Sequence, residues 1–227
     1  MEIFFENIIS NAAPELITLF IQADVSNPPT SDELWNEIEN ECIDISTHYA
    51  MEQIRLRPAI DAVRRVYKAL GKDPNRYRPS AEALCRRAVK GLGLYRTDTL
   101  IDLINLVSLR TGHSIGGFDA NKISGDTLTL GAGREGEPYE AIGRGQLNIA
   151  GLPVYRDNIG GIGTPTSDND RTKLSPETTR IILTVNLYGN SELSHTQTEA
   201  LIIELLEKYA AAHNIIKRYY PVNNGNN

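Results

Sequence analysis

The chain has 227 residues, of which 41% are hydrophobic and 23% charged, and its formal net charge is −6. This composition is typical of an ordinary globular protein and excludes a disordered or fibrous chain. The apolar runs are too short to span a bilayer, and the N-terminus lacks the positive region of a signal peptide. We therefore expect a cytoplasmic protein without membrane contacts.

The first third of the chain predicts one strand and two helices. Residues 15–25 (ELITLFIQADV) are typical of a strand, and the next segment predicts a helix over residues 30–50 that begins at Thr30 or Ser31. A second helix is predicted over residues 57–71, with Pro58 in its first turn and Gly71 at its end. Residues 74–79, rich in proline and charge, predict a linker-like boundary after an N-terminal extension of residues 1–73.

After this boundary the pattern changes from helices to strands. Helices are predicted over residues 80–93, capped by Ser80, and over residues 97–112, ending at Gly112. Short strands separated by glycine-rich turns are predicted between residues 125 and 189, and a last helix begins at Ser194 or Thr196. This order indicates an α+β fold, and residues 217–227 predict a polar C-terminal tail.

Common cofactor and metal motifs are missing from the sequence. The glycines of GGIGTPT lack the Gly-Lys-Ser/Thr ending of a phosphate loop. The two cysteines, Cys42 and Cys85, have the pattern of small core residues, and a calcium loop would need more ligands than Asp168 and Asp170. We therefore predict neither a metal nor a cofactor.

The charges are unevenly distributed. Between Arg64 and Lys90 there are nine cations and only two anions, although the whole chain is acidic. The net charge argues against a generic nucleic-acid binder, because such binding relies on neutralising phosphates. The local stretch is either a solvated helix face or an RNA contact, for which the candidates are Arg76, Arg78, Arg86 and Arg87.

Several segments together resemble a known family. These are the passage INLVSLRTGHSIGGFD (104–119), the later pair of glycines in RDNIGGIGTPTSDNDRT (156–172), and the strand TRIILTVNLYG about twenty residues further on. Their order and spacing resemble the B3/B4 domain of the bacterial phenylalanyl-tRNA synthetase beta subunit, in a free-standing form. The resemblance covers roughly residues 76–213, and we assign residues 80–216 to the B3/B4-like domain.

The resemblance implies an editing fold, with a mostly antiparallel sheet flanked by helices and a small N-terminal α/β extension. In the synthetase this domain hydrolyses the ester that joins a wrongly attached, tyrosine-like amino acid to tRNA. The chain does not resemble the ligase domains, so it is not expected to make aminoacyl-tRNA. The implied activity is that of a deacylase acting in trans on mischarged tRNA, with a synthetase as a further candidate partner and no DNA partner.

The polar loop of residues 156–172 predicts a substrate-binding loop. An aminoacyl ester is already activated, so hydrolysis mainly requires a held water and donors for the developing oxyanion. The backbone of Gly160, Gly161 and Gly163 can approach a substrate closely, and the hydroxyls of Thr164 and Ser167 can bind ribose or water. Asp168 or Asp170 is expected to hold the substrate ammonium group.

The sequence also departs from the family pattern at its candidate site. Gly116 stands where the family has its site histidine, and His113, three residues earlier, either caps the preceding helix or replaces that histidine with a near-neutral pKa. The candidate catalytic residues are therefore His113 and Thr164. Asn105, Thr184 and Asn186 predict a pocket that is more polar than one for tyrosine, or differently shaped.

Two other classes of function remain compatible with the sequence. One is a non-catalytic protein that binds tRNA, an amino acid or another small ligand, and the altered site residues favour it. The other is an accessory partner of a synthetase. Ester hydrolysis above the spontaneous rate distinguishes the deacylase from both of these classes.

Overall fold

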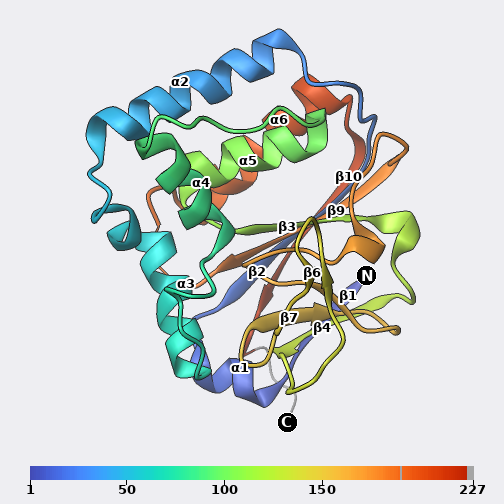
Figure 1. Ribbon diagram of the computed structural model, residues 1–227. Helices are drawn as coiled ribbons and strands as arrows, with labels where there is room; N and C mark the ends of the chain where they lie inside the picture. The colour runs from blue at the N-terminus through green and yellow to red at the C-terminus, as the bar shows by residue number, and fades with distance from the viewer. Residues whose placement is uncertain (190, 224–227) are drawn as a thin grey trace.

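The computed structural model describes residues 1–189 and 191–223, and the α+β fold class is confirmed (Figure 1). The helices are α1 (Asn7–Ala12), α2 (Asp32–His48), α3 (Pro58–Ala69), α4 (Ser80–Val89), α5 (Thr99–Thr111) and α6 (His195–Ala210). The strands are β1 (Glu2–Phe5), β2 (Ile17–Asp24), β3 (Ile115–Asp119), β4 (Thr127–Ala132), β5 (Glu140–Ala141), β6 (Gly145–Gln146), β7 (Pro153–Arg156), β8 (Gly161–Gly163), β9 (Arg180–Leu187) and β10 (His213–Pro221). Within the described residues, none of the helices is long and apolar enough to cross a membrane.

Two four-stranded sheets form the centre of the molecule. The first has the order β10-β2-β9-β3 and is antiparallel throughout. The second has the order β1-β4-β7-β8, in which only the β1–β4 pair is parallel. The short strands β5 and β6 pair with each other. The expectation of a mostly antiparallel sheet flanked by helices is therefore confirmed.

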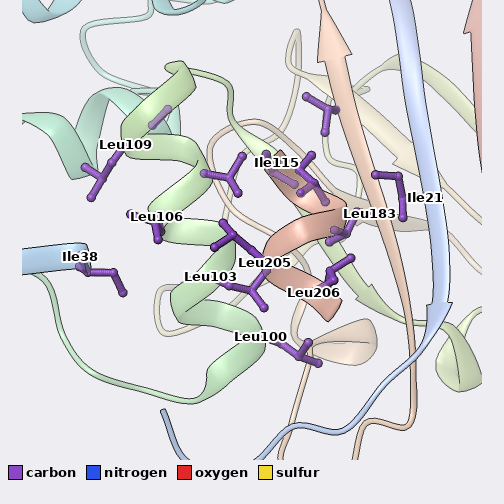
Figure 2. Close-up of a cluster of buried hydrophobic side chains, with 14 of the residues drawn as sticks. Ile21, Ile38, Leu100, Leu103, Leu106, Leu109, Ile115, Leu183, Leu205 and Leu206 are labelled. Atoms are coloured by element: carbon purple, nitrogen blue, oxygen red, sulfur yellow. The ribbon is translucent and has the colours of Figure 1, made fainter. Parts of the chain in front are cut away.

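The central strands of the first sheet, β2 and β9, are buried on both faces, and their successive side chains point to opposite sides. In β2, Leu19 and Ile21 join the core that packs against the helices, whereas Phe20 joins the core shared with the second sheet. Figure 2 shows the helix-side core, in which leucines of α5 and α6 meet Ile21 of β2 and Leu183 of β9. The chain is thus layered as helices, first sheet and second sheet.

The predicted ends of several elements are confirmed by their caps. The Ser31 hydroxyl accepts a hydrogen bond from Leu34 N at the start of α2, and Pro58 opens α3. Gly112 ends α5 in the left-handed region, with φ +73°, and Ser194 forms a capping box with Gln197 in α6. Ser80, predicted as a cap, is instead the first residue of α4.

The predicted boundary at residues 74–79 does not separate two folding units. Strand β2, which lies before it, pairs along its whole length with β9, and each of the three hydrophobic cores contains residues from both sides of the boundary. The buried Arg64 of α3 also donates hydrogen bonds to Pro74 O and Asn75 Oδ1. The sequence marked a turn correctly but could not show this long-range pairing.

The prediction of a polar tail from residue 217 is wrong for residues 217–221. These residues belong to β10, which pairs antiparallel with β2, so that Lys217 lies opposite Ile21 and Tyr219 opposite Leu19. The strand is at the sheet edge, and most of its side chains are exposed. An exposed edge strand has a polar sequence that resembles a tail, which explains the error.

Candidate functional site

A cavity of about 280 Å³ lies where the face of α5, strand β3 and the loop after β8 meet. Its walls combine apolar side chains with a few polar groups, which is typical of a ligand pocket. The lining residues are Ser80, Ile101, Ile104, Asn105, Ser108, Ile115, Gly117, Ile142, Thr164, Ser167, Asp168, Lys173 and Leu174.

One wall of the cavity is a single face of α5. Ile101, Ile104, Asn105 and Ser108 recur at the three- and four-residue spacing that places side chains on one side of a helix. Within the described residues, the Asn105 amide and the Ser108 hydroxyl make no side-chain hydrogen bond, so both are free to bind a ligand. Asn105, predicted as a substrate-binding residue, thus lines this cavity.

The opposite wall is a tight turn after β8, held by its own hydrogen bonds. The Thr164 hydroxyl donates to Ser167 O at 3.0 Å and accepts from Thr166 N and Ser167 N. Tyr139 OH donates to Ser167 O at 2.8 Å and fixes the turn from outside. The Thr164 hydroxyl is therefore already engaged, and its role in this geometry is to shape the turn that presents Asp168.

Asp168 contributes the carboxyl group of the cavity. Its Oδ2 accepts a hydrogen bond from Gly117 N of β3 at 3.1 Å, which joins the turn to the sheet. Burial raises the pKa of Asp168 from 3.8 to about 7, and the Gly117 hydrogen bond opposes only part of this rise. Within the described residues, no cation is paired with Asp168. The lysine of the cavity, Lys173, is instead paired with Asp170 at 2.8 Å.

Four predicted substrate-binding residues lie beside this cavity and line a second void of only about 10 Å³. These residues are Gly116, Gly163, Thr184 and Asn186. The space is small because an aromatic ring fills it: a Cβ added to Gly163 would lie 2.5 Å from the Phe118 ring. A space of this size holds at most a water molecule, so these residues support the cavity rather than line it.

Asn186 is occupied by the protein itself. Its Oδ1 accepts hydrogen bonds from Thr18 Oγ1 at 3.0 Å and from Tyr155 OH, and its Nδ2 donates to Tyr188 OH at 3.1 Å. These bonds satisfy a buried amide within the core between the sheets. The polar residues of β9 therefore do not make the main cavity more polar.

Two glycines and an aspartate of the predicted substrate loop also lie away from the cavity. Gly160 N donates to Asp157 Oδ1 at 3.1 Å in a turn, and Gly161 packs against the Tyr139 ring, which leaves no room for a Cβ. Asp170, in its half-exposed ion pair with Lys173, does not line the cavity. Of the two aspartates that the sequence left open, only Asp168 faces it.

His113 is buried and lines neither the cavity nor the smaller void. Its Nε2 has no hydrogen-bond partner among the described residues. Burial, with smaller contributions from His195 and Arg57, lowers the pKa of His113 to about 4. The expectation of a near-neutral pKa is therefore wrong, because the sequence could not show how deeply this residue is buried.

The positive stretch divides into paired and unpaired cations. The buried Glu82 of α4 binds Arg64 at 2.8 Å and Arg86 at 2.9 Å, with Arg78 at 3.6 Å. Arg87 instead lies over the Tyr95 ring, and Arg76 lies over the Tyr77 ring. Arg78 and Arg86 thus share a carboxylate, which weakens their case as phosphate ligands.

Sequence reasoning missed several residues that line the cavity. Gly117 was noted only as part of a turn, although its backbone N–H orients Asp168. Ser108 lies three residues after Asn105, a spacing that could have revealed it. Ile142 and Lys173 come from loops far apart in the sequence, and no local signal identifies them.

Comparisons with known proteins identify the family of the chain. The profile of the B3/4 domain matches residues 62–205, and the chain therefore belongs to the B3/4 domain family, as the sequence resemblance predicted. Among solved structures, it is similar to an N-terminal fragment of the phenylalanyl-tRNA synthetase beta subunit from Pyrococcus horikoshii, with 11% identity and a TM-score of 0.47. That alignment covers 97% of this chain but 54% of the fragment, so the chain spans about half its length. No curated protein matches the chain.

Proposed function

We propose that the chain removes wrongly attached amino acids from tRNA by hydrolysing the ester bond, acting in trans. The B3/4 family membership suggests a function related to tRNA, and the cavity offers the groups that an aminoacyl ester needs. The observation that carries the proposal is a carboxyl group, Asp168, placed at the wall of an otherwise largely apolar cavity without a cationic partner among the described residues.

Asp168 is suited to bind the substrate's α-ammonium group. An α-amino group has a pKa of about 7.7–8.0, and Asp168 has a pKa of about 7, so both are charged in a common range near neutral pH. Burial disfavours an unpaired carboxylate, and the ammonium group supplies the opposite charge that compensates it. The apolar side chains of α5, together with Ile115 and Leu174, then surround the amino acid side chain.

Hydrolysis in this site relies mainly on positioning. With the ammonium group held by Asp168, the ester carbonyl lies near the 164–168 turn. There the Ser167 hydroxyl, which donates only a long hydrogen bond of 3.4 Å to Asp168 O among the described residues, or a backbone N–H can orient water or the developing oxyanion. An activated ester needs no strong base for this step. Two substrate atoms decide the orientation, namely the ammonium nitrogen and the carbonyl oxygen.

A panel of mischarged tRNAs tests the proposal with Asp168→Asn and the matched control Asp170→Asn. We expect the wild type to release one or a few amino acids above the spontaneous rate. Loss of one charge-assisted contact should lower kcat/KM about 10- to 100-fold in Asp168→Asn. Asp170→Asn should stay within about two-fold, because an exposed ion pair contributes little. No release from any tRNA by the wild type would refute the proposal.

The second candidate function is binding without turnover. It is favoured by two observations: no histidine is among the described residues that line the cavity, and the Thr164 hydroxyl is engaged in its turn. Binding of free amino acids, measured by calorimetry on the same two variants, separates this candidate from the hydrolase. This candidate would be supported by an amino acid whose binding requires Asp168, together with no release of that amino acid from an aminoacyl ester.

A further inference from the structure

The segment between α4 and α5, residues 90–98, exposes two large side chains. Tyr95 is 75% exposed and Leu92 is 59% exposed, and neither is needed for the core. Contiguous exposed apolar side chains, rather than isolated ones, mark binding sites, and Leu92 and Tyr95 lie in one short segment beside an apolar groove that Leu92 helps to line. We refer to Arg87, Lys90, Leu92 and Tyr95 as the Tyr95 surface.

Arg87 is fixed against the ring of Tyr95. Its guanidinium carbon lies 4.4 Å from the ring centroid, and its Nε donates to Gly93 O at 3.0 Å. Arg87 is therefore held by the backbone and in turn contacts the Tyr95 ring. Among the described residues, no carboxylate forms an ion pair with Arg87 or Lys90. The surface thus combines an ordered aromatic ring with two uncompensated cations, on a chain of net charge −6.

Helix α4 connects this surface to the cavity. Its first residue, Ser80, lines the cavity, and Arg87 in its last turn and Lys90 just after it lie at the other end. A ten-residue helix is about 15 Å long. A ligand that enters the cavity with one end can therefore reach the Tyr95 surface with a short extension.

We infer that the Tyr95 surface binds the unpaired end of an RNA, with a base stacked on Tyr95 and phosphates beside Arg87 and Lys90. The inference rests on the proposed function, because that function places an aminoacylated RNA end in the cavity. Stacking on an aromatic side chain suits single-stranded nucleic acid of any sequence, and cations supply the salt-dependent part of the affinity. The paired Arg78 and Arg86 are not needed for this contact.

An apolar groove of about 610 Å³ lies beside the Tyr95 surface and offers a protein partner another contact. It is lined by residues of α2, including Trp35 and Ile43, and by Leu92 and Leu94. The uncompensated cations and the exposed ring favour RNA over an apolar peptide. Unchanged RNA affinity after removal of the ring would favour the peptide and overturn the inference.

The test is binding of a fluorescent, unacylated single-stranded RNA oligonucleotide, followed by anisotropy at several salt concentrations. We expect Tyr95→Ala to weaken binding about 10-fold or more, whereas Tyr95→Phe, which keeps the ring, stays within about two-fold. The double variant Arg87→Gln, Lys90→Gln should lower the salt slope by about 1.4, at about 0.7 for each single-strand phosphate contact. Circular dichroism confirms that each variant is folded.

Arg180→Gln is the matched control, because Arg180 is an exposed cation that is paired with Asp24. An equal loss in Arg180→Gln, or an unchanged affinity in Tyr95→Ala, would overturn the inference. Hydrolysis of a small aminoacyl ester by the wild type tests the proposed function separately. RNA binding that depends on Tyr95 without ester hydrolysis would therefore support this surface while refuting the hydrolase.

Discussion

Replacing Asp168 by Asn should make the protein more stable and less active at the same time. Asparagine keeps an oxygen that accepts the hydrogen bond from Gly117 N, but it removes a carboxylate whose pKa is raised from 3.8 to about 7 by burial. A raised pKa means that the folded state binds the proton more tightly than the unfolded state. The wild type therefore loses stability as the pH rises from about 4 to about 7, and the asparagine variant does not.

The size of this effect follows from the pKa. A rise from 3.8 to about 7 corresponds to about 4 kcal/mol of stability. The residue is mostly buried but partly exposed at the cavity wall, so solvent screens part of the charge, and we expect a gain of about 1–3 kcal/mol for Asp168→Asn at pH 8. At pH 4 the two proteins should be equally stable within about 0.5 kcal/mol.

Denaturant unfolding at pH 4, 6 and 8, together with ester hydrolysis at pH 8, measures both consequences. A site that keeps a buried charge in order to bind its substrate is expected to be less stable, and more active, than the same site without the charge. The reasoning would be refuted by a variant that is less stable than the wild type at pH 8, or by a stability difference that is independent of pH. Either result would mean that Asp168 is a structural residue whose charge the fold already compensates.

Two further predictions concern buried positions near the cavity. The pKa of His113 is lowered to about 4, so the unfolded state binds the proton more tightly, and stability should fall by up to about 3 kcal/mol as the pH drops from 6.5 to 4. His113→Gln should flatten this acid limb in unfolding curves, and an unchanged limb would contradict the pKa direction. Gly163→Ala places a Cβ 2.5 Å from the Phe118 ring and 2.8 Å from Asp168 Oδ1. It should cost about 1–3 kcal/mol and lower hydrolysis by displacing Asp168, and full activity in this variant would show that the turn tolerates the shift.

The long helices and the central strands, with several of their ends, were determined by the sequence itself, whereas the short β1 and α1 and the edge strand β10 were not. Alternating and helical hydrophobic patterns, together with local signals such as Ser31, Pro58, Gly112 and Ser194, predicted the main helices and strands. The reason is that capping and side-chain periodicity act over a few residues. The family resemblance also depended on local segments in a fixed order, and the match to the B3/4 domain confirmed it.

Which polar residues face the cavity was decided only by the tertiary structure. Asp168 and Asp170 are two residues apart and equivalent in the sequence, yet a hydrogen bond from β3 turns one to the cavity and Lys173 holds the other at the surface. Asn186 was equally plausible as a ligand, but residues from β2 and β7 satisfy its amide. These outcomes depend largely on contacts between distant segments, since 51 residues separate Gly117 from Asp168 and 168 separate Thr18 from Asn186. Such contacts fix burial and partners, and no local pattern encodes them.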